Sequence, residues 1–469
     1  MNLGQIRDAL GAVGSIGEAA SQVPTGVQTD SRCIRGGELF FCISGERFDG
    51  HTFAADVLKK GACAVVAERP PFSMDEMDAM GEAPVLIVPD TVAALGRLAL
   101  HHRVAAKAMV AGITGTAGKT TVKELLAHVL SMRGTTAKNH LNKNNQIGLP
   151  LSMLDASGDE KFWVMEAGIS EAHDMDELGA TLRPDLAIVL NVGQGHVSGL
   201  GDKGVGYYKA RLLSHIARGG VGLVSADYPE LVQHARANCT ELRLFSAIDP
   251  AVPYFAEYAG PAGEGMGRYR VNLEGKEFEV EAPFRGSYGA ENVIAVAAAA
   301  DILGLSSREI IEGLKTAVLP QQRFNCRRIG AWLVVDDTYN SNPLSAGRMV
   351  ESTAENAAGG PLVLVMGEML ELGDVANEAH VGLGRKMGSA NPVAVFWKGG
   401  QVDAVQQGLT ESGWKGTFAS VNDADAFIRA FAGLDIASGT VLFKGSRSNK
   451  MEILADAFCS VVQDGQEGR

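Results

Sequence analysis

The chain has 469 residues, 46% of them hydrophobic and 21% charged, which suits a globular protein of roughly two to four domains with a sizeable core. The net charge is −13 and no long basic block occurs, which argues against nucleic-acid binding. No apolar stretch approaches the roughly 18–20 residues of a membrane span, no signal peptide is evident, and the six cysteines show neither CxxC nor metal-ligand spacing, so we expect reduced thiols and a cytoplasmic location.

Residues 1–107 are predicted to form a small α/β domain. Short apolar runs predict its strands, at 37–43, 62–67 and 85–88. Apolar residues at helical spacing predict a helix over 53–60. A polar loop holds Ser31 and Arg32, which composition alone reads equally well as a solvated turn or as a phosphate contact.

The second predicted domain, 108–319, opens with the most informative stretch of the chain. Its apolar run 109–111 predicts a buried strand, and the apolar spacing over 122–133 predicts a helix, with a glycine-rich loop between them. Strand, glycine loop and helix in this order form a phosphate-binding loop, because backbone N–H groups and a helix N-terminus both favour an anion.

Within this loop, Lys119 can reach the β and γ phosphates of a nucleotide, and the hydroxyl of Thr120 can bind Mg²⁺. The candidate nucleotide-binding residues are Gly115, Thr116, Ala117, Gly118, Lys119, Thr120 and Thr121. The match to the general pattern is imperfect, since Ile113 stands where the first glycine is expected. The alternative is an ordinary strand-to-helix turn with a surface lysine.

Two polar residues follow later strands of the same domain. A predicted strand at 162–165 ends at Glu166, and another at 186–190 leads into a loop that holds His196. Because the carboxyl ends of parallel strands share one edge of a sheet, both side chains can meet the phosphate loop. Glu166 is a candidate Mg²⁺ ligand, with a helix cap as its alternative, and His196 has a structural role as its alternative.

Three further stretches of this domain carry weaker signals. Residues 142–145 resemble the guanine-reading motif of GTPases but lack its Asp, which argues against a GTPase. Residues 207–211 open a helical segment in which Lys209, on composition alone, is a solvated residue. An alanine-rich helix within 285–300 is expected to be tightly packed.

Residues 320–469 are predicted to form a third domain with a doubly wound, Rossmann-like sheet. Its strands are predicted at 332–335, 362–365, 394–397 and 440–443, each followed by a polar loop. No GxGxxG follows any of them, so no dinucleotide is assigned. The predicted fold class is α/β, with a central P-loop-type parallel sheet domain between two further α/β domains.

Taken together, these motifs resemble the Mur ligase family over nearly the whole chain, from Asp30-Ser31-Arg32 to Lys444-Gly445-Ser446-Arg447. The stretch from Thr114 to Thr120 is similar to the family's Thr-Gly-x-x-Gly-Lys-Thr, and 144–150 to its Asn-Asn-x-x-Gly-x-Pro. Three stretches resemble the member that adds D-alanyl-D-alanine to UDP-N-acetylmuramoyl-tripeptide: 337–343, 367–373 and 444–447.

The resemblance implies an ATP-dependent amide ligase that works through an acyl phosphate in cytoplasmic peptidoglycan precursor synthesis. It implies ATP and Mg²⁺ as cofactors, the UDP-linked tripeptide and D-alanyl-D-alanine as substrates, and we expect a monomer. The resemblance assigns Lys119 to the phosphates, and it also implies one set of ligands for Mg²⁺ and another for the nucleotide. Mg²⁺ would be held by Thr120, Glu166, His196 and a carbamylated Lys209, and the nucleotide by Asn292, Arg323 and Asp337. Substrate contacts would come from Ser31, Arg32, Asn144, Asn145 and Asn340.

Two positions depart from the family pattern. Arg211 stands where a Glu is usual, and Ala295 replaces the second Asn of an Asn-x-x-Asn helix start. Two kinds of alternative remain open. One is a sibling or folylpolyglutamate-type ligase with another acceptor, and the other is a P-loop regulatory ATPase without ligase activity.

Overall fold

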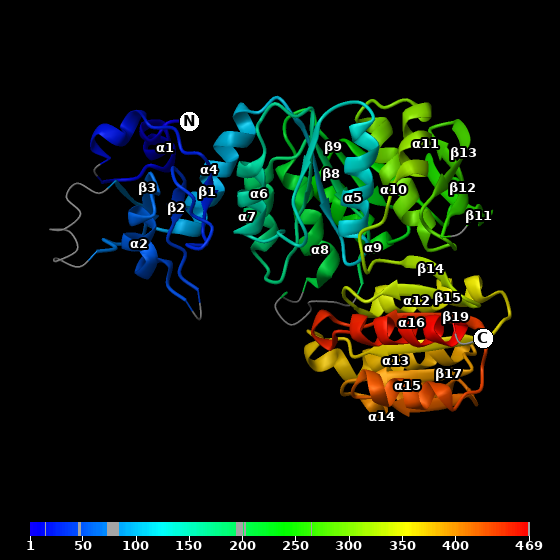
Figure 1. Ribbon diagram of the computed structural model, residues 1–469. Helices are drawn as coiled ribbons and strands as arrows, with labels where there is room; N and C mark the ends of the chain where they lie inside the picture. The colour runs from blue at the N-terminus through cyan, green and yellow to red at the C-terminus, as the bar shows by residue number, and fades with distance from the viewer. Residues whose placement is uncertain are drawn as a thin grey trace.

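The computed structural model describes residues 1–14, 16–45, 48–72, 84–193, 200, 203–263 and 265–467, with no side chains given for 464–467. The chain folds into three units, each with its own sheet (Figure 1). The N-terminal unit lies at one end of the central unit, and the C-terminal unit packs along another side of it, next to α9 and α10 (Figure 1). The predicted α/β class and the three-domain architecture are confirmed.

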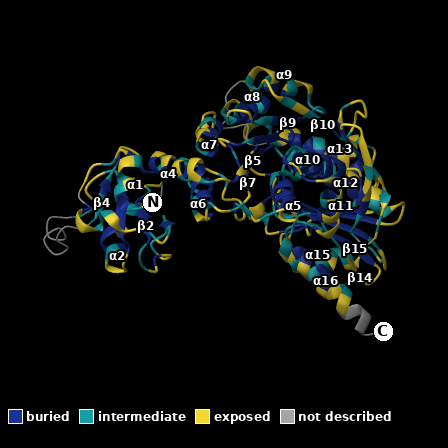
Figure 2. Ribbon diagram, turned by 90° about the horizontal axis from the view of Figure 1, so that it is seen from above, coloured by how far each residue is buried: buried dark blue, intermediate teal, exposed yellow. Residues whose placement is uncertain are grey.

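The N-terminal unit has a parallel sheet of order β1-β2-β3-β4 in its described part. Its elements are α1 Leu3–Leu10, the 3₁₀ turn η1 Gly17–Ser21, β1 Val27–Gln28, β2 Leu39–Phe41, η2 Gly50–Phe53, α2 Ala54–Lys59, β3 Ala64–Ala67, β4 Val85–Ile87 and α4 Thr91–Ala105. The strands expected from the apolar runs are present; β2 and β3 are fully buried, whereas only Leu86 is buried in β4. Helix α4 packs against α6 and α7 and so joins this unit to the next (Figure 2).

The central unit holds a sheet of order β13-β12-β11-β10-β9-β8-β5-β7-β6, as far as the chain is described. Its elements are β5 Met109–Thr114, α5 Lys119–Ser131, β6 Thr136–Lys138, α6 Gly148–Asp155, β7 Phe162–Glu166, α7 Asp174–Leu182, β8 Leu186–Val189, α8 Gly204–Ala210, η3 Arg211–His215, β9 Val221–Ser225, α9 Pro229–Asn238, β10 Leu242–Ser246, β11 Tyr254–Pro261, β12 Gly267–Leu273, β13 Lys276–Ala282, α10 Gly289–Ile302 and α11 Ser307–Thr316. Strands β5 to β11 all run parallel to one another, and β12 and β13 extend the sheet through antiparallel pairings.

The central sheet is covered by helices on both faces. On β8, Leu186 and Ile188 belong to the apolar cluster with α5 and α10, while Ala187 and Val189 belong to the cluster with α6, α7 and α9. Every residue of α10 from Gly289 to Ala300 is buried, as expected for the alanine-rich stretch. Figure 2 shows the buried strands inside and the exposed outer faces of the helices around them.

Two details differ from the sequence predictions. The antiparallel strands β12 and β13 were not anticipated, because a parallel sheet was inferred from the loop and its flanking strands. The helix expected to open at 207–211 instead begins at Gly204 and ends at Ala210, where the chain tightens into the 3₁₀ turn η3. Lys209 therefore sits in the last turn of a short helix.

The C-terminal unit has a sheet of order β14-β15-β19-β16-β17-β18, in which only β14 is antiparallel to its neighbour among the described strands. Its elements are β14 Asn325–Ile329, β15 Trp332–Asp337, α12 Pro343–Ala357, β16 Leu362–Gly367, η4 Gly373–Val375, α13 Ala376–Ser389, β17 Ala394–Lys398, α14 Val402–Glu411, β18 Thr417–Ser420, α15 Ala424–Ala432, β19 Gly439–Lys444, η5 Arg447–Asn449 and α16 Glu452–Glu467. Helices α12 to α14 share an apolar cluster with one face, and α15 and α16 with the other.

An apolar contact joins the central and C-terminal units. The cluster around α5 and α10 continues without a break into α12 and the C-terminal sheet. Between the units, the ring of Phe324 lies 6.5 Å from that of Phe284 and 6.0 Å from that of Tyr288, measured between centroids. No helix in the part of the chain that the structure describes is long and apolar enough to cross a membrane.

Candidate active site

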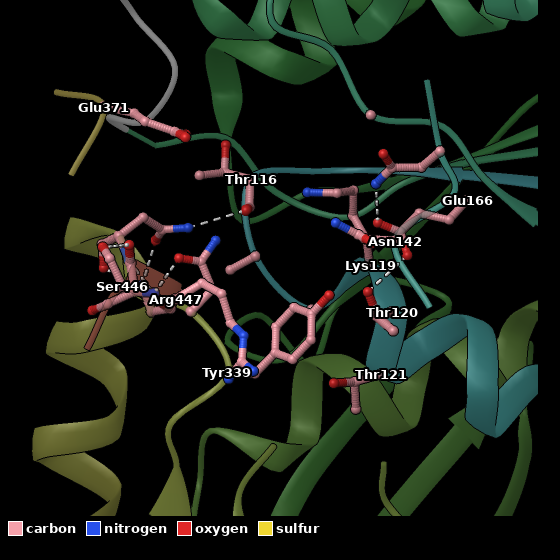
Figure 3. A pocket seen from close by; sticks show the side chains of 18 of the residues that line it. Thr116, Lys119, Thr120, Thr121, Asn142, Glu166, Tyr339, Glu371, Ser446 and Arg447 are labelled. Atoms are coloured by element: carbon pink, nitrogen blue, oxygen red, sulfur yellow. Dashed lines mark hydrogen bonds between the residues drawn. The ribbon is translucent and has the colours of Figure 1, made fainter. Parts of the chain in front are cut away.

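A cavity of about 630 Å³ lies between the central and C-terminal units. One wall comes from the loop after β5, the carboxyl end of β7 and the segment before α6, and the other from the loops after β15, β16 and β19. Figure 3 shows Lys119 and Glu166 on one side of it and Ser446 and Arg447 on the other. The cavity therefore sits where ligands of parallel sheets bind, at the carboxyl ends of the strands.

The loop between β5 and α5 has the geometry expected of a phosphate-binding loop. Helix α5 begins at Lys119 rather than at Val122, because Gly118 caps it with a left-handed φ of 82°. A side chain at Gly118 would also bring its Cβ to 2.7 Å from Oδ1 of Asn292, so glycine is required there. The first turn of α5 lines the cavity and offers N–H groups that lack helical partners.

Asn191, directly after β8, braces this loop. Its Oδ1 accepts hydrogen bonds from the backbone N–H groups of Thr116 at 3.1 Å and Ala117 at 2.8 Å, and its Nδ2 donates to the Ala117 carbonyl at 3.1 Å. The residue is almost completely buried. No role was predicted for Asn191 from the sequence, although an amide directly after the strand predicted at 186–190 was an available signal.

Thr120 and Glu166 meet as predicted from their positions after neighbouring strands. The Thr120 hydroxyl donates to Glu166 Oε2 at 2.7 Å, and both residues are buried. Asn144 donates from Nδ2 to Oε1 of the same carboxylate, also at 2.7 Å. Because the carboxylate binds these two side chains and no helix N-terminus, the structure disfavours the helix-cap alternative for Glu166.

A second set of bonds fixes the segment that carries Asn144. Asn139 accepts from the backbone N–H of Glu166 at 2.9 Å and donates to the Glu166 carbonyl at 3.0 Å. Lys123, fully buried in α5, donates to the carbonyls of Asn139 at 2.6 Å and Leu141 at 3.1 Å. Leu141 has a left-handed φ of 53°, which is strained for this residue type. Lys123 was missed because a lysine in an amphipathic helix reads as solvated.

Two lysines lie close to the Glu166 carboxylate. Lys119 folds back and donates to the Gly115 carbonyl at 2.9 Å. Burial lowers the pKa of Lys119, the charge of Glu166 opposes this, and Arg323 adds to the lowering. Lys209 is 4% exposed, and burial, helped by the charge of Lys119, lowers its pKa well below 10.5. The interpretation of Lys209 as a solvated helix residue was therefore wrong.

The donors at this corner of the cavity fit a hard divalent cation. A buried hydroxyl and a buried carboxylate, from Thr120 and Glu166, are already in contact, and Mg²⁺ prefers such oxygen ligands. A neutral Lys209 would not repel a cation there, whereas its charged form would. His196, the other expected ligand, lies outside the described residues.

The opposite wall is organised around Asp337 at the end of β15. Its Oδ2 accepts from Lys444 Nζ at 2.5 Å, and Lys444 also donates to the Asn340 carbonyl at 2.8 Å. Asp337 Oδ1 accepts from the backbone N–H of Phe324 at 3.1 Å. Asp337 and Asn340 therefore line the cavity as expected, in loops held together by a buried lysine.

Arg323 reaches the cavity from the connection between the two units. Its guanidinium stacks 4.0 Å from the ring centroid of Tyr339. The flanking residues Gln322 and Phe324 both have left-handed φ values, 61° and 53°. Such strain at non-glycine residues concentrates at functional sites, so the backbone here is consistent with a placed arginine.

The remaining expected site residues divide between the cavity and other places. Thr121 and Asn145 line the cavity, whereas Asn292 is buried behind Gly118. Ser31 and Arg32 lie outside the cavity, in the N-terminal unit, and the Arg32 side chain is 86% exposed with an ion pair to Asp30 at 2.6 Å.

The two departures from the family pattern leave the cavity intact. Arg211 points to Asp176 on α7, with 2.8 Å between Nη2 and Oδ1, so its charge is compensated away from the cavity wall. Ala295 is fully buried within α10.

Comparison with family models divides most of the chain into three successive matches. The Mur ligase family, catalytic domain model matches residues 24–103, the Mur ligase middle domain model residues 113–300, and the Mur ligase, glutamate ligase domain model residues 322–447.

Individual relatives are similar over almost their entire length. The chain is 32% identical to UDP-N-acetylmuramoyl-tripeptide–D-alanyl-D-alanine ligase of Escherichia coli (strain K12), covering 91% of this chain and 92% of the relative. It is 28% identical to the enzyme of the same name from Bacillus subtilis (strain 168), covering 91% of both. A crystal structure of MurF from Acinetobacter baumannii superposes with a TM-score of 0.85 at 28% identity, covering 98% of both chains.

Proposed function

The chain belongs to the Mur ligase family, and we infer that it is an ATP-dependent peptide ligase that joins D-alanyl-D-alanine to UDP-N-acetylmuramoyl-tripeptide in peptidoglycan precursor synthesis. The observation that carries this function is the cavity, in which a phosphate-binding loop faces the strand-end loops of the C-terminal sheet across a shared space. Such a space can hold a nucleotide and the reacting ends of two substrates together.

Amide formation requires an activated carboxyl group. The terminal carboxylate of the tripeptide attacks the γ-phosphorus of ATP, and the bond to the bridging oxygen breaks, giving an acyl phosphate and ADP. The amine of D-alanyl-D-alanine then attacks the acyl carbon and forms the C–N bond of a tetrahedral intermediate, which loses the amine proton and expels phosphate to give the amide. Lys119 and the N–H groups at the start of α5 offset the negative charge of the moving phosphoryl group.

Water must be excluded while the acyl phosphate exists, because hydrolysis would waste ATP. The two walls come from different units, so their docking both assembles the site and shields it. Asn145 and Asn340 line opposite walls of the cavity, and we propose that they contact substrates held between them. We assign UDP binding to the unit 1–107 with Ser31 and Arg32, ATP binding to 108–319, and the nucleotide contacts Arg323 and Asp337 to 320–469.

We propose Thr120 and Glu166 as the residues that would hold Mg²⁺, with His196 as a further ligand. A bound Mg²⁺ would supply positive charge to the phosphate oxygens. Asn292, behind Gly118, is proposed to contact the adenine side of the nucleotide. We further propose a cytoplasmic, monomeric enzyme.

Lys209 is proposed to be carbamylated in the active enzyme. Addition of CO₂ requires a neutral amine, and burial already favours that form of Lys209. The carbamate would place beside Lys119 an anion that offers oxygen ligands, in place of a neutral amine that carries no negative charge. A ¹³C NMR spectrum with labelled bicarbonate is expected to show a carbamate signal that Lys209→Arg lacks. No signal in the wild type, together with full activity of the Arg variant, would contradict this role.

The function is tested by phosphate release with a panel of amine acceptors. Release that requires both the UDP-linked tripeptide and D-alanyl-D-alanine is expected. Preference for another amino acid would indicate a sibling ligase, and steady ATP hydrolysis without either substrate would indicate a regulatory ATPase.

A further inference from the structure

Helix α12 of the C-terminal unit lies along the central unit and contacts it through polar groups at several turns. Asn342, its N-cap, donates from Nδ2 to the carbonyl of Thr116 in the phosphate loop at 3.2 Å. Near its other end, Glu355 accepts from the N–H and hydroxyl of Ser287 at 2.9 and 2.7 Å. Together with the Phe324 contact, the helix therefore forms part of the surface by which the C-terminal unit, lower in Figure 1, docks.

Between these two contacts, α12 presents a partly buried arginine to the central unit. Arg348 forms an ion pair from Nη1 to Glu291 Oε2 on α10 and a hydrogen bond from Nη2 to the Tyr228 hydroxyl. The side chains of Arg348 and Glu291 are 22% and 6% exposed. Burial lowers the pKa of Arg348, but the charge and hydrogen bond of Glu291, together with the nearby Tyr228 and Tyr288, raise it above its ordinary value. Because this ion pair is largely shielded from water, removing one partner leaves an uncompensated charge and strongly lowers stability.

The same carboxylate oxygen of Glu291 also links Arg348 to the phosphate loop. Glu291 Oε2 accepts from Asn191 Nδ2 at 3.0 Å, and Asn191 in turn holds the backbone of Thr116 and Ala117. A continuous chain of contacts thus runs from α12 through Arg348, Glu291 and Asn191 to the loop. Asn342 reaches the loop from its other side.

We propose that Glu291 and Arg348 are positioning residues that couple docking of the C-terminal unit to the shape of the phosphate loop. When α12 docks, Arg348 fixes the Glu291 carboxylate, which orients the Asn191 amide and hence the backbone of the phosphate loop at Thr116 and Ala117. Neither residue lines the cavity, so neither touches substrate directly. The inference rests on the ligase function proposed above.

The chain offers two matched controls. Glu355→Ala removes a contact of the same helix with the central unit that has no path to the loop. Arg103→Met removes a buried arginine of α4, which pairs with Asp185 of the central unit at 2.8 Å, away from α12. The first controls for docking contacts in general, and the second for the loss of a buried ion pair.

The test compares ATP dissociation constants, steady-state kinetics and melting temperatures of the full-length variants. Arg348→Met and Glu291→Gln are expected to weaken ATP binding and lower kcat by about tenfold each, while KM for the UDP-linked tripeptide changes less than about twofold. Arg348→Lys should recover part of the loss. Glu355→Ala and Arg103→Met should leave ATP binding within about twofold, although Arg103→Met lowers the melting temperature.

The double variant Glu291→Gln/Arg348→Met separates positioning from charge compensation. Its melting temperature should recover toward that of the wild type, because no unpaired charge stays buried, while ATP binding stays weak. Normal ATP affinity in the double variant, or equal losses in the two controls, would overturn the coupling. Since ATP binding is measured without ligation, an inactive wild type would instead contradict the proposed function.

Discussion

The two walls of the cavity are built in different ways. On the central wall, Thr120, Glu166 and Asn144 form a closed set of short hydrogen bonds, largely buried, within one unit. On the C-terminal wall, Lys444 holds Asp337 and Glu452 holds the exposed Arg447, both within the C-terminal unit, so these groups and the exposed Asn340 join the site only when that unit docks. The groups for phosphoryl transfer are thus set in advance, and the groups that complete the site arrive with the second unit.

The largest effect is expected when the positive charge of Lys119 is removed from the central wall. Lys119→Ala should lower the ligation rate by about 10³-fold or more, because stabilisation of the phosphates worth several kcal/mol is lost. The fold should persist, since the Lys119 ammonium makes a single bond, to a loop carbonyl, among the described residues. Initial rates and circular dichroism check both, with exposed Lys107→Ala as the control. A variant that keeps a tenth of wild-type turnover would rule out the phosphate role.

A smaller loss is expected when the central wall keeps its shape but not its charge. Glu166→Gln can still accept from Thr120, yet it offers no anion to a cation. We expect a rate about 10-fold to 100-fold lower and a higher Mg²⁺ requirement. The measurement is a Mg²⁺ titration of activity, with the exposed Glu177→Gln as control. An unchanged titration would remove Glu166 from the metal site.

On the C-terminal wall, a buried histidine makes a contribution to folding stability that depends on pH. His380 is fully buried, its Nδ1 lies 2.6 Å from the Ala376 carbonyl, and its Nε2 accepts from the N–H of Met369 at 3.0 Å, beside the cavity loop after β16. Burial lowers the pKa of His380 below 6.5, so the folded protein binds this proton less well than the unfolded chain.

Stability from this group is fully present above pH 6.5 and is lost as the pH falls from there toward the lower pKa of the folded state. The loss reaches at most about 1.4 kcal/mol per pH unit. Denaturant unfolding between pH 8 and about pH 5 should show a steeper decline for the wild type than for His380→Gln. Parallel pH profiles of the two proteins would contradict the assignment.

The smallest effect is expected outside both walls. Arg32 is exposed and paired only with the nearby Asp30 among the described residues, so Arg32→Ala should leave the melting temperature unchanged. If the N-terminal unit holds the UDP part, KM for the UDP-linked tripeptide should rise about threefold to tenfold, with KM for ATP unaffected. Unchanged kinetics toward both substrates would leave Arg32 as part of a solvated turn.

The sequence allowed more to be predicted about the central wall than about the opposite one. The order of strand, glycine loop and helix around Gly118 is local, and strand-end positions bring Glu166 to it by a general rule of parallel sheets. The pair of Glu291 and Arg348 was not predicted, because two charged helix residues far apart in the chain each read as solvated. Likewise, no pattern indicated that Lys123 would be buried, since its acceptors are backbone carbonyls of a strained segment.

The central claim is that the cavity transfers the γ-phosphoryl group of ATP to a substrate carboxylate before the amide forms. It is tested most directly with UDP-N-acetylmuramoyl-tripeptide labelled with ¹⁸O in its terminal carboxylate, ligated to D-alanyl-D-alanine. Mass spectrometry should find a single ¹⁸O in each released phosphate, because one labelled oxygen leaves with phosphorus and the other stays in the amide. Unlabelled phosphate formed alongside the ligated product would contradict the acyl-phosphate route.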